Sequence, residues 1–134
     1  MDYTELIKRL VDIDTDPEEE FDLIKTIGKG AYGQVYKALN KKTGSIVALK
    51  LIPLNQFDNI EACIKELEIL ASCSSEHIVK FVSAFYKNDH LWIAMEYCAS
   101  GSIKDLISMT ERPLDEPLIA AILFLVLKGI SYLH

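Results

Sequence analysis

From Phe21 onward, apolar and polar residues alternate with a period of two over several short runs, the pattern of strands with one buried face. These runs are rich in β-branched residues, as strands are. Residues 40–44 supply the Asn and Gly that hairpin turns favour, and residues 87–90 form a second polar turn. The predicted strands are Phe21–Ile27, Gln34–Leu39, Ser45–Ile52, Ile78–Tyr86 and Leu91–Glu96.

Other segments repeat apolar residues every three to four positions, which predicts amphipathic helices. The predicted helices are Thr4–Val11, Asp58–Cys73, Ile103–Met109 and Glu116–Leu133. In the second, Asp58 is the expected N-cap, with Glu61 as its capping-box partner. The last helix is apolar nearly all round, so we expect protein to surround it. Its longest apolar run, Leu118–Leu127, is too short to span a bilayer.

The order of these elements predicts an α+β fold. It consists of a five-stranded antiparallel sheet with one helix after the third strand, followed by two more helices. Residues 1–20 are predicted to form a short helix and an acidic lead-in that is solvated or poorly ordered. The stretch from Asp12 to Asp22 has seven acidic residues and no basic one, so the rest of the chain, whose total net charge is −6, is nearly neutral.

The composition of the chain argues against some classes of function and partner. The acidic balance is the opposite of what binding to a phosphate backbone requires, so we expect no nucleic-acid partner. The three cysteines, Cys63, Cys73 and Cys98, have no Cys-x-x-Cys spacing, which predicts reduced thiols in a cytosolic or nuclear protein, and we expect a cytoplasmic one. The residues after Met1 do not resemble a secretory signal, and we expect no membrane association.

Residues 28–33, Gly-Lys-Gly-Ala-Tyr-Gly, match the phosphate-binding pattern G-x-G-x-x-G. In dinucleotide-binding proteins a helix opens at this loop, and an acidic residue follows about 20 positions later. Here a strand is predicted after Gly33, and the distant position holds Lys50 at the end of Val-Ala-Leu-Lys. These features favour the other version of the motif, a β-hairpin lid over nucleotide phosphates with a lysine on the next strand.

Lys50 lies within the apolar run Ile46–Ile52, where a buried ammonium group needs a partner. A carboxylate on the following helix can supply it. Glu66 is the favoured candidate because we place it on the buried face of that helix, and Glu68 and Glu61 are the alternatives. On the neighbouring strands, the small Ala48 would leave room for a flat base and Val35 would cover it.

Together these motifs resemble the N-terminal lobe of a protein kinase, from about Phe21 to the last residue. The segments that carry the resemblance are residues 27–35, 47–50, 65–70, 77–81 and 92–98. Three segments are similar in sequence to the germinal-centre branch of the sterile-20 serine/threonine kinases. They are residues 16–23, Met95-Glu96-Tyr97-Cys98 and residues 128–134. The resemblance implies an N-lobe over residues 21–96, a hinge over 97–101 and the first C-lobe helices over 102–134.

The resemblance also implies phosphoryl transfer from ATP-Mg to protein Ser or Thr, in signalling with regulatory protein partners. Lys50 and Glu66 would be the catalytic residues. Met95 would take the gatekeeper position, and the backbones of Glu96 and Cys98 would bind the adenine edge. The implied nucleotide-binding residues are Ile27, Gly28, Lys29, Gly30, Ala31, Tyr32, Gly33, Val35, Ala48, Lys50, Met95, Glu96, Cys98 and Ser102.

The sequence contains neither His-Arg-Asp nor Asp-Phe-Gly. Phosphoryl transfer needs the carboxylates of these motifs, one to accept a proton and one to hold Mg²⁺. We therefore expect the Mg²⁺ ligands to lie outside these residues and the 134 residues alone to be inactive. The alternative is an inactive kinase fragment or a pseudokinase-like interaction module. Its last helix would expose apolar surface and favour dimerisation.

Overall fold

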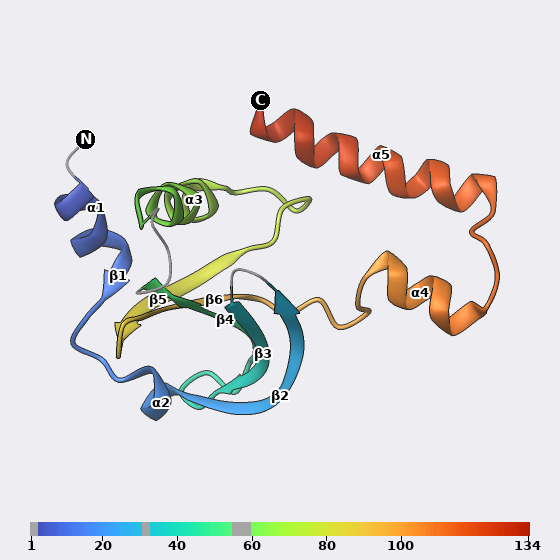
Figure 1. Ribbon diagram of the computed structural model, residues 1–134. Coiled ribbons are helices and arrows are strands. Elements are labelled where there is room, and N and C mark those ends of the chain that lie inside the picture. Colours follow the sequence, from blue (N-terminus) through green and yellow to red (C-terminus); the bar gives the residue numbers. More distant parts are fainter. Residues whose placement is uncertain (1–2, 31–32, 55–59) are drawn as a thin grey trace. The chain divides into compact units, whose positions relative to one another are not determined.

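The computed structural model describes residues 3–30, 33–54 and 60–134 (Figure 1). The chain divides into two compact units. The first contains the residues up to Cys73 together with Val79–Tyr97, and the second contains Ser74–Ile78 and Cys98–His134. The α+β class predicted from the sequence is confirmed.

The first unit is built on a six-stranded sheet with the order β1-β5-β6-β4-β3-β2. Every neighbouring pair is antiparallel except β1 and β5, which are parallel. The strands are β1 Val11–Asp12, β2 Phe21–Gly30, β3 Gly33–Asn40, β4 Ile46–Pro53, β5 Phe81–Lys87 and β6 His90–Glu96. The five predicted strands are therefore confirmed, although β5 starts at Phe81 rather than at Ile78, and β1 is an addition.

The helices agree with the predicted ones apart from one short addition, α2. The predicted N-cap Asp58 lies outside the described residues. The helices are α1 Tyr3–Leu10, α2 Pro17–Glu20, α3 Ile60–Ser72, α4 Ile103–Thr110 and α5 Glu116–Leu133. Both predicted hairpin turns form. Gly44 adopts φ 73° in the first, and Asn88 and Asp89 adopt φ 52° and 58° in the second. Two successive left-handed residues are typical of the type I′ turn that suits twisted strands.

Side chains along β4 alternate between the two faces of the sheet, and each face carries one core cluster. Val47 and Leu49 belong to the first cluster, and Ile52 belongs to the second. Helices α1 and α3 cover the second face, where Leu6 and Leu67 are almost completely buried (Figure 1). The first cluster is Phe21, Ala38, Val47, Leu49, Phe85, Trp92 and Ala94, and the second is Val11, Ile52, Leu67, Ala84, Leu91 and Ile93.

The acidic segment contains β1 and α2, so the prediction of a poorly ordered lead-in is wrong, whereas most of its acidic side chains are exposed, as the solvated alternative predicts. Val11 pairs with Ala84 in the parallel ladder of β1 and β5. Asp16 caps α2 by accepting a hydrogen bond from the backbone N–H of Glu18, and Pro17 is buried. The ammonium of Lys87, at the end of β5, lies 2.7 Å from an Asp16 carboxylate oxygen and 2.6 Å from one of Glu18. Lys87 thus ties this segment to the end of β5, and Lys41 and Lys42 add weaker ion pairs to it from the turn between β3 and β4.

In the second unit, α5 packs on the segment Ser74–Ile78. Gly129 is its buried residue, and a Cβ there would lie 3.1 Å from the carbonyl oxygen of His77. The backbone N–H of Ser74 donates a 2.7 Å hydrogen bond to the hydroxyl of Tyr132. Small size at residue 129 therefore allows the close approach.

Most of the apolar side chains of α5 are exposed, so the expectation that protein surrounds this helix is not met within the described residues. It is the one helix of the described ranges that is long and apolar enough, by length and composition alone, to cross a membrane. The prediction that this segment is too short to span a bilayer counted only its ten-residue apolar run. The helix itself has 18 residues and is about 27 Å long. The core helix of a soluble protein passes the same test, so this finding alone is weak evidence for a membrane span.

We expect the Lys87→Met variant to lose less stability in acid than the wild-type protein. The hydrogen bond from Lys87 holds the pKa of the Asp16 carboxyl below its usual value. A group with a depressed folded-state pKa contributes stability above its unfolded-state pKa of about 3.9, and this stability is lost as pH falls through the folded value. Urea unfolding at about pH 6 and pH 3 checks the prediction. Equal losses in both proteins would contradict it.

Candidate functional site

The register of the sheet places five of the predicted nucleotide-binding residues, from β2, β3, β4 and β6, on one face. Gly28 lies opposite Val35, Val35 lies opposite Lys50, and Ala48 lies opposite Met95. Residues directly opposite each other in an antiparallel ladder project to the same side. The five side-chain positions are therefore neighbours on one surface of the sheet.

The same face carries α3. Ile52, two residues after Lys50 on β4, packs in one cluster with Leu67 of α3. Because side chains alternate along a strand, Lys50 projects to the side that α3 covers. The helix that should supply its carboxylate partner is thus on the correct side of the sheet.

The predicted orientation of Glu66 is wrong. Its side chain is exposed, whereas Ile64 and Leu67 form the buried face of α3. Glu66 precedes Leu67 by one residue and is therefore rotated from it by about 100° around the helix axis. Lys50 is half-buried, and within the described residues no carboxylate lies within 4.0 Å of its ammonium. The alternative partner Glu68 is half-buried and is not bonded to it either.

The predicted lid is a β-hairpin. A strand, β3, follows Gly33 where a dinucleotide-binding loop would require a helix, which excludes that reading. Ile27, Gly28, Lys29 and Gly30 complete β2, and Ala31 and Tyr32 lie outside the described residues.

The three glycines of the hairpin differ in what the fold requires. Gly33 has φ +126°, and a Cβ there would lie 2.0 Å from the carbonyl oxygen of Leu51. A Cβ on Gly28 would meet only Val35, at an ordinary 3.7 Å, and one on Gly30 would meet nothing within 4 Å. The packing of the chain therefore explains glycine at 33 only. Bare backbone at 28 and 30 suits close approach of a ligand such as a phosphate.

The end of β6 is held by a pair of hydrogen bonds. The backbone N–H of Glu96 donates to the carbonyl of Lys80 at 2.9 Å, and a carboxylate oxygen of Glu96 accepts from the N–H of Lys80 at 3.1 Å. Met95 packs against the second core cluster together with Leu70 and Phe81. These contacts fix the segment that leads to Cys98.

Cys98 and Ser102 belong to the second unit. The Cys98 side chain is exposed. Ser102 caps α4: its hydroxyl accepts from the N–H of Asp105 at 3.1 Å and donates to the Asp105 carboxylate at 2.9 Å. The N–H of Ser102 also donates to this carboxylate and is the main cause of the lowered pKa of Asp105. Ser102 therefore has a structural role whether or not it contacts a nucleotide.

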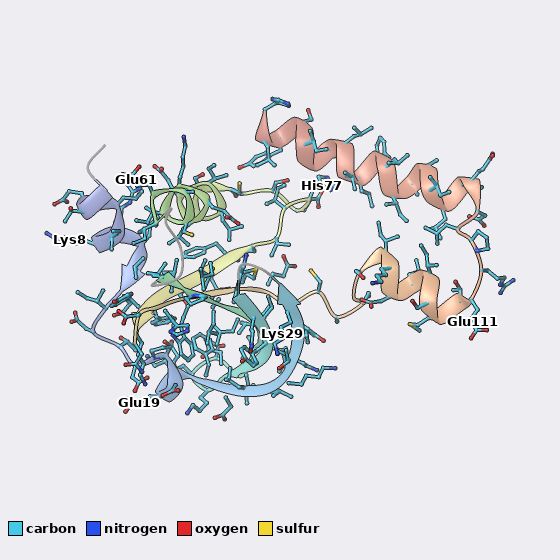
Figure 2. The ribbon with its side chains drawn as sticks, in the orientation of Figure 1. Lys8, Glu19, Lys29, Glu61, His77 and Glu111 are labelled. Carbon is cyan, nitrogen blue, oxygen red and sulfur yellow. The ribbon has the colours of Figure 1, made fainter. Side chains whose placement is uncertain are left out.

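Lys29 belongs to a different surface from Lys50. It lies near the end of β2 (Figure 2) and lines a pocket of about 340 Å³ together with Tyr36, Leu51 and His90. Leu51 packs against the first core cluster, so this pocket is on the face of the sheet opposite α3. A larger pocket, of about 720 Å³, lies between the segment 7–15 and β5 and contains none of the predicted site residues.

Lys37 and Lys80 are not among the site residues predicted from the sequence. Lys37 lies two residues after Val35 on β3, opposite Ala48, and its ammonium lies 5.1 Å from the ring centroid of Tyr97. The period of two that identified Val35 also places Lys37 on the same face, so that signal was present. Nothing in the local sequence indicates the bonds that Lys80 makes to Glu96.

Residues 21–134 match the family model of the protein kinase domain. The chain belongs to the protein kinase family. Over 119 residues it is 45% identical to Serine/threonine-protein kinase 4 homolog B from Dictyostelium discoideum, an alignment that covers 89% of this chain and 11% of that kinase. The chain thus spans about a tenth of the length of the curated kinase that it matches. The resemblance to the sterile-20 germinal-centre branch is confirmed for a partial kinase domain.

A kinase domain also binds Mg²⁺. In the described ranges, no three His, Cys, Asp or Glu side chains gather in a way that could hold a metal ion. The described residues present a glycine hairpin without Cβ atoms at 28 and 30, and a lysine on the strand that pairs with β3.

We expect Gly33→Ala to destabilise the protein by about 2–3 kcal/mol, because it combines an unfavourable backbone conformation with a backbone clash. Gly30→Ala is the matched control and should change the free energy of unfolding by less than about 0.5 kcal/mol. Urea-induced unfolding of the two variants measures both values. Equal stability of the two variants would contradict the structural role assigned to Gly33.

Proposed function

We propose that this chain is the ATP-binding part of a serine/threonine kinase that transfers a phosphoryl group from ATP-Mg to proteins in cytoplasmic signalling. The observation that carries the proposal is that Gly28 of the glycine hairpin lies on the same face of the sheet as Val35, Ala48 and Lys50. The serine/threonine class rests on the name of the matched relative. The cytoplasmic location rests on the free state of the three cysteines.

In this proposal the adenine base lies between Val35 and Ala48, with Met95 at the back of the site. The backbones of Glu96 and Cys98 hold the edge of the base. The N–H of Glu96 is already bonded to Lys80, so the carbonyl oxygen of Glu96 is the group that accepts from the adenine amine. Ser102 is a further polar contact to the nucleotide.

The phosphates bind at the other end of this face. The ammonium of Lys50 neutralises part of their charge, and the backbone at Gly28 and Gly30 approaches them closely. Ile27, Lys29, Ala31, Tyr32 and Gly33 complete the lid in this proposal. Glu66 orients Lys50 once the phosphates are bound. Because Glu66 is exposed in the structure, α3 must turn toward β4 for this pair to form.

Bound Mg²⁺ neutralises the charge that develops during phosphoryl transfer, and carboxylate and amide side chains hold it. The sequence carries neither Asp-Phe-Gly nor the catalytic-loop motif His-Arg-Asp. Within these residues, the proposed chemistry is therefore limited to binding ATP, positioning its phosphates and shielding them from water.

The second candidate is a catalytically inactive kinase fragment or pseudokinase-like module that binds proteins. It is favoured by the exposed apolar side chains of α5. The two candidates differ in whether the gene product that contains these residues transfers phosphate.

We expect Lys50→Met in the full-length gene product to reduce phosphoryl transfer by at least about 100-fold, because the phosphates lose their cation. Lys65→Met, on the exposed side of α3, is the matched control and should stay within about twofold. Transfer of ³²P from labelled ATP to a general protein substrate measures both. Undiminished transfer by Lys50→Met would refute the role of Lys50. Absence of transfer by the wild-type protein would favour the second candidate.

We also expect the 134-residue chain alone to self-associate through α5. Leu123, Phe124 and Leu127 are 54%, 58% and 61% exposed, and contiguous apolar surface of this kind favours association. Leu127→Glu should shift the chain toward monomer in sedimentation velocity, whereas Ser131→Glu, which adds the same charge to α5 without removing an apolar group, should not. A wild-type chain that stays monomeric at all concentrations would contradict this prediction.

A further inference from the structure

Lys37 and Tyr97 make a contact that the proposed nucleotide site does not yet explain. The Lys37 ammonium lies 5.1 Å from the centroid of the Tyr97 ring, within the range of a cation–π interaction. Both residues are half-buried and belong to the first unit. The contact joins the middle of β3 to the residue that follows the last strand, β6.

The ring of Tyr97 is the partner that the structure gives to this charge. Within the described residues no carboxylate lies within 4.0 Å of Lys37. Its neighbour across the ladder on β2 is Lys25, a like charge that is unfavourable in this position. The aromatic face therefore compensates for an ammonium that has no acid beside it.

The contact lies next to the proposed base site. Lys37 is directly opposite Ala48, and Ala48 is directly opposite Met95, so the three form a row across β3, β4 and β6. Tyr97 comes two residues after Met95. The Lys37 side chain thus spans from the row to the segment whose backbone we propose to hold the adenine edge.

Two kinds of contact then hold this segment in place. Glu96 is fixed through its backbone and its carboxylate by Lys80. Within the described residues no comparable pair of hydrogen bonds holds Tyr97, and its ring is held by Lys37. Without Lys37, the strand would stay anchored at Glu96 but the ring after it would be free to change rotamer.

We infer that Lys37 is a positioning residue for the base of the bound nucleotide. Its ammonium fixes the ring of Tyr97 and thereby the backbone at Glu96 and Tyr97. The inference rests on the proposed function, because it assigns Lys37 to the base end of that site. It sets Lys37 apart from Lys50, which acts on the phosphates at the other end.

The test separates the base from the phosphates by titration calorimetry on the full-length gene product, with adenosine and with inorganic tripolyphosphate as probes. Lys37→Met should weaken adenosine binding about five- to tenfold and leave tripolyphosphate binding within about twofold. Lys37→Arg should bind adenosine like the wild type, because a guanidinium also stacks on an aromatic ring. Lys25→Met, which removes the neighbouring charge that has no ring partner, is the matched control and should change neither affinity.

A second pair of variants guards against a general disturbance of the sheet. Tyr97→Phe keeps the ring and should bind adenosine normally, whereas Tyr97→Leu should bind it as weakly as Lys37→Met. The double variant Lys37→Met with Tyr97→Leu should be no weaker than either single variant, because both remove one interaction. Wild-type affinity of Lys37→Met for adenosine would overturn the inference and leave the proposed function standing. A wild-type protein that binds neither adenosine nor tripolyphosphate would overturn both.

Discussion

The ladder between β3 and β4 is the constraint on which the rest of the candidate site depends. It sets Val35 against Lys50 and Lys37 against Ala48, and the next ladder sets Ala48 against Met95. A shift of the register by one residue would send all of these side chains to the opposite face. The pairing that builds the sheet is therefore the pairing that assembles the proposed nucleotide surface.

Two features hold this register in place. Gly33, at the start of β3, approaches the carbonyl of Leu51 on β4 so closely that no side chain fits there. On the face of the sheet that α3 covers, Ile52 packs with Leu67 of α3, and α1 packs against the same helix. The N-terminal segment supports this arrangement, because β1 extends the sheet beyond β5 and Lys87 binds the acids of α2. Residues outside the kinase-domain match thus contribute to the unit that carries the site.

The strands and hairpins could be predicted because their signals are local. The alternation from Gln34 to Leu39 and the Asn and Gly of the turn that follows are visible in a short window of sequence. The structure of the acidic segment could not be predicted in this way. It depends on Lys87, which lies 71 residues from Asp16, and on a parallel pairing with β5. The prediction that Glu66 lies on the buried face of α3 was wrong for a different reason. Helical periodicity identified the apolar stripe, but one residue of error in its centre rotates a side chain by about 100°. Lys37 was overlooked because its aromatic partner lies 60 positions away in the sequence, a distance that no periodicity reports.

The most direct test of the account is the position of a bound nucleotide, determined in a crystal structure of the full-length gene product with a non-hydrolysable ATP analogue. The account predicts the base between Val35 and Ala48, with the phosphates at Lys50 beneath Gly28 and Gly30. A nucleotide bound on the opposite face of the sheet, in the pocket of Lys29, Tyr36 and His90, would contradict it.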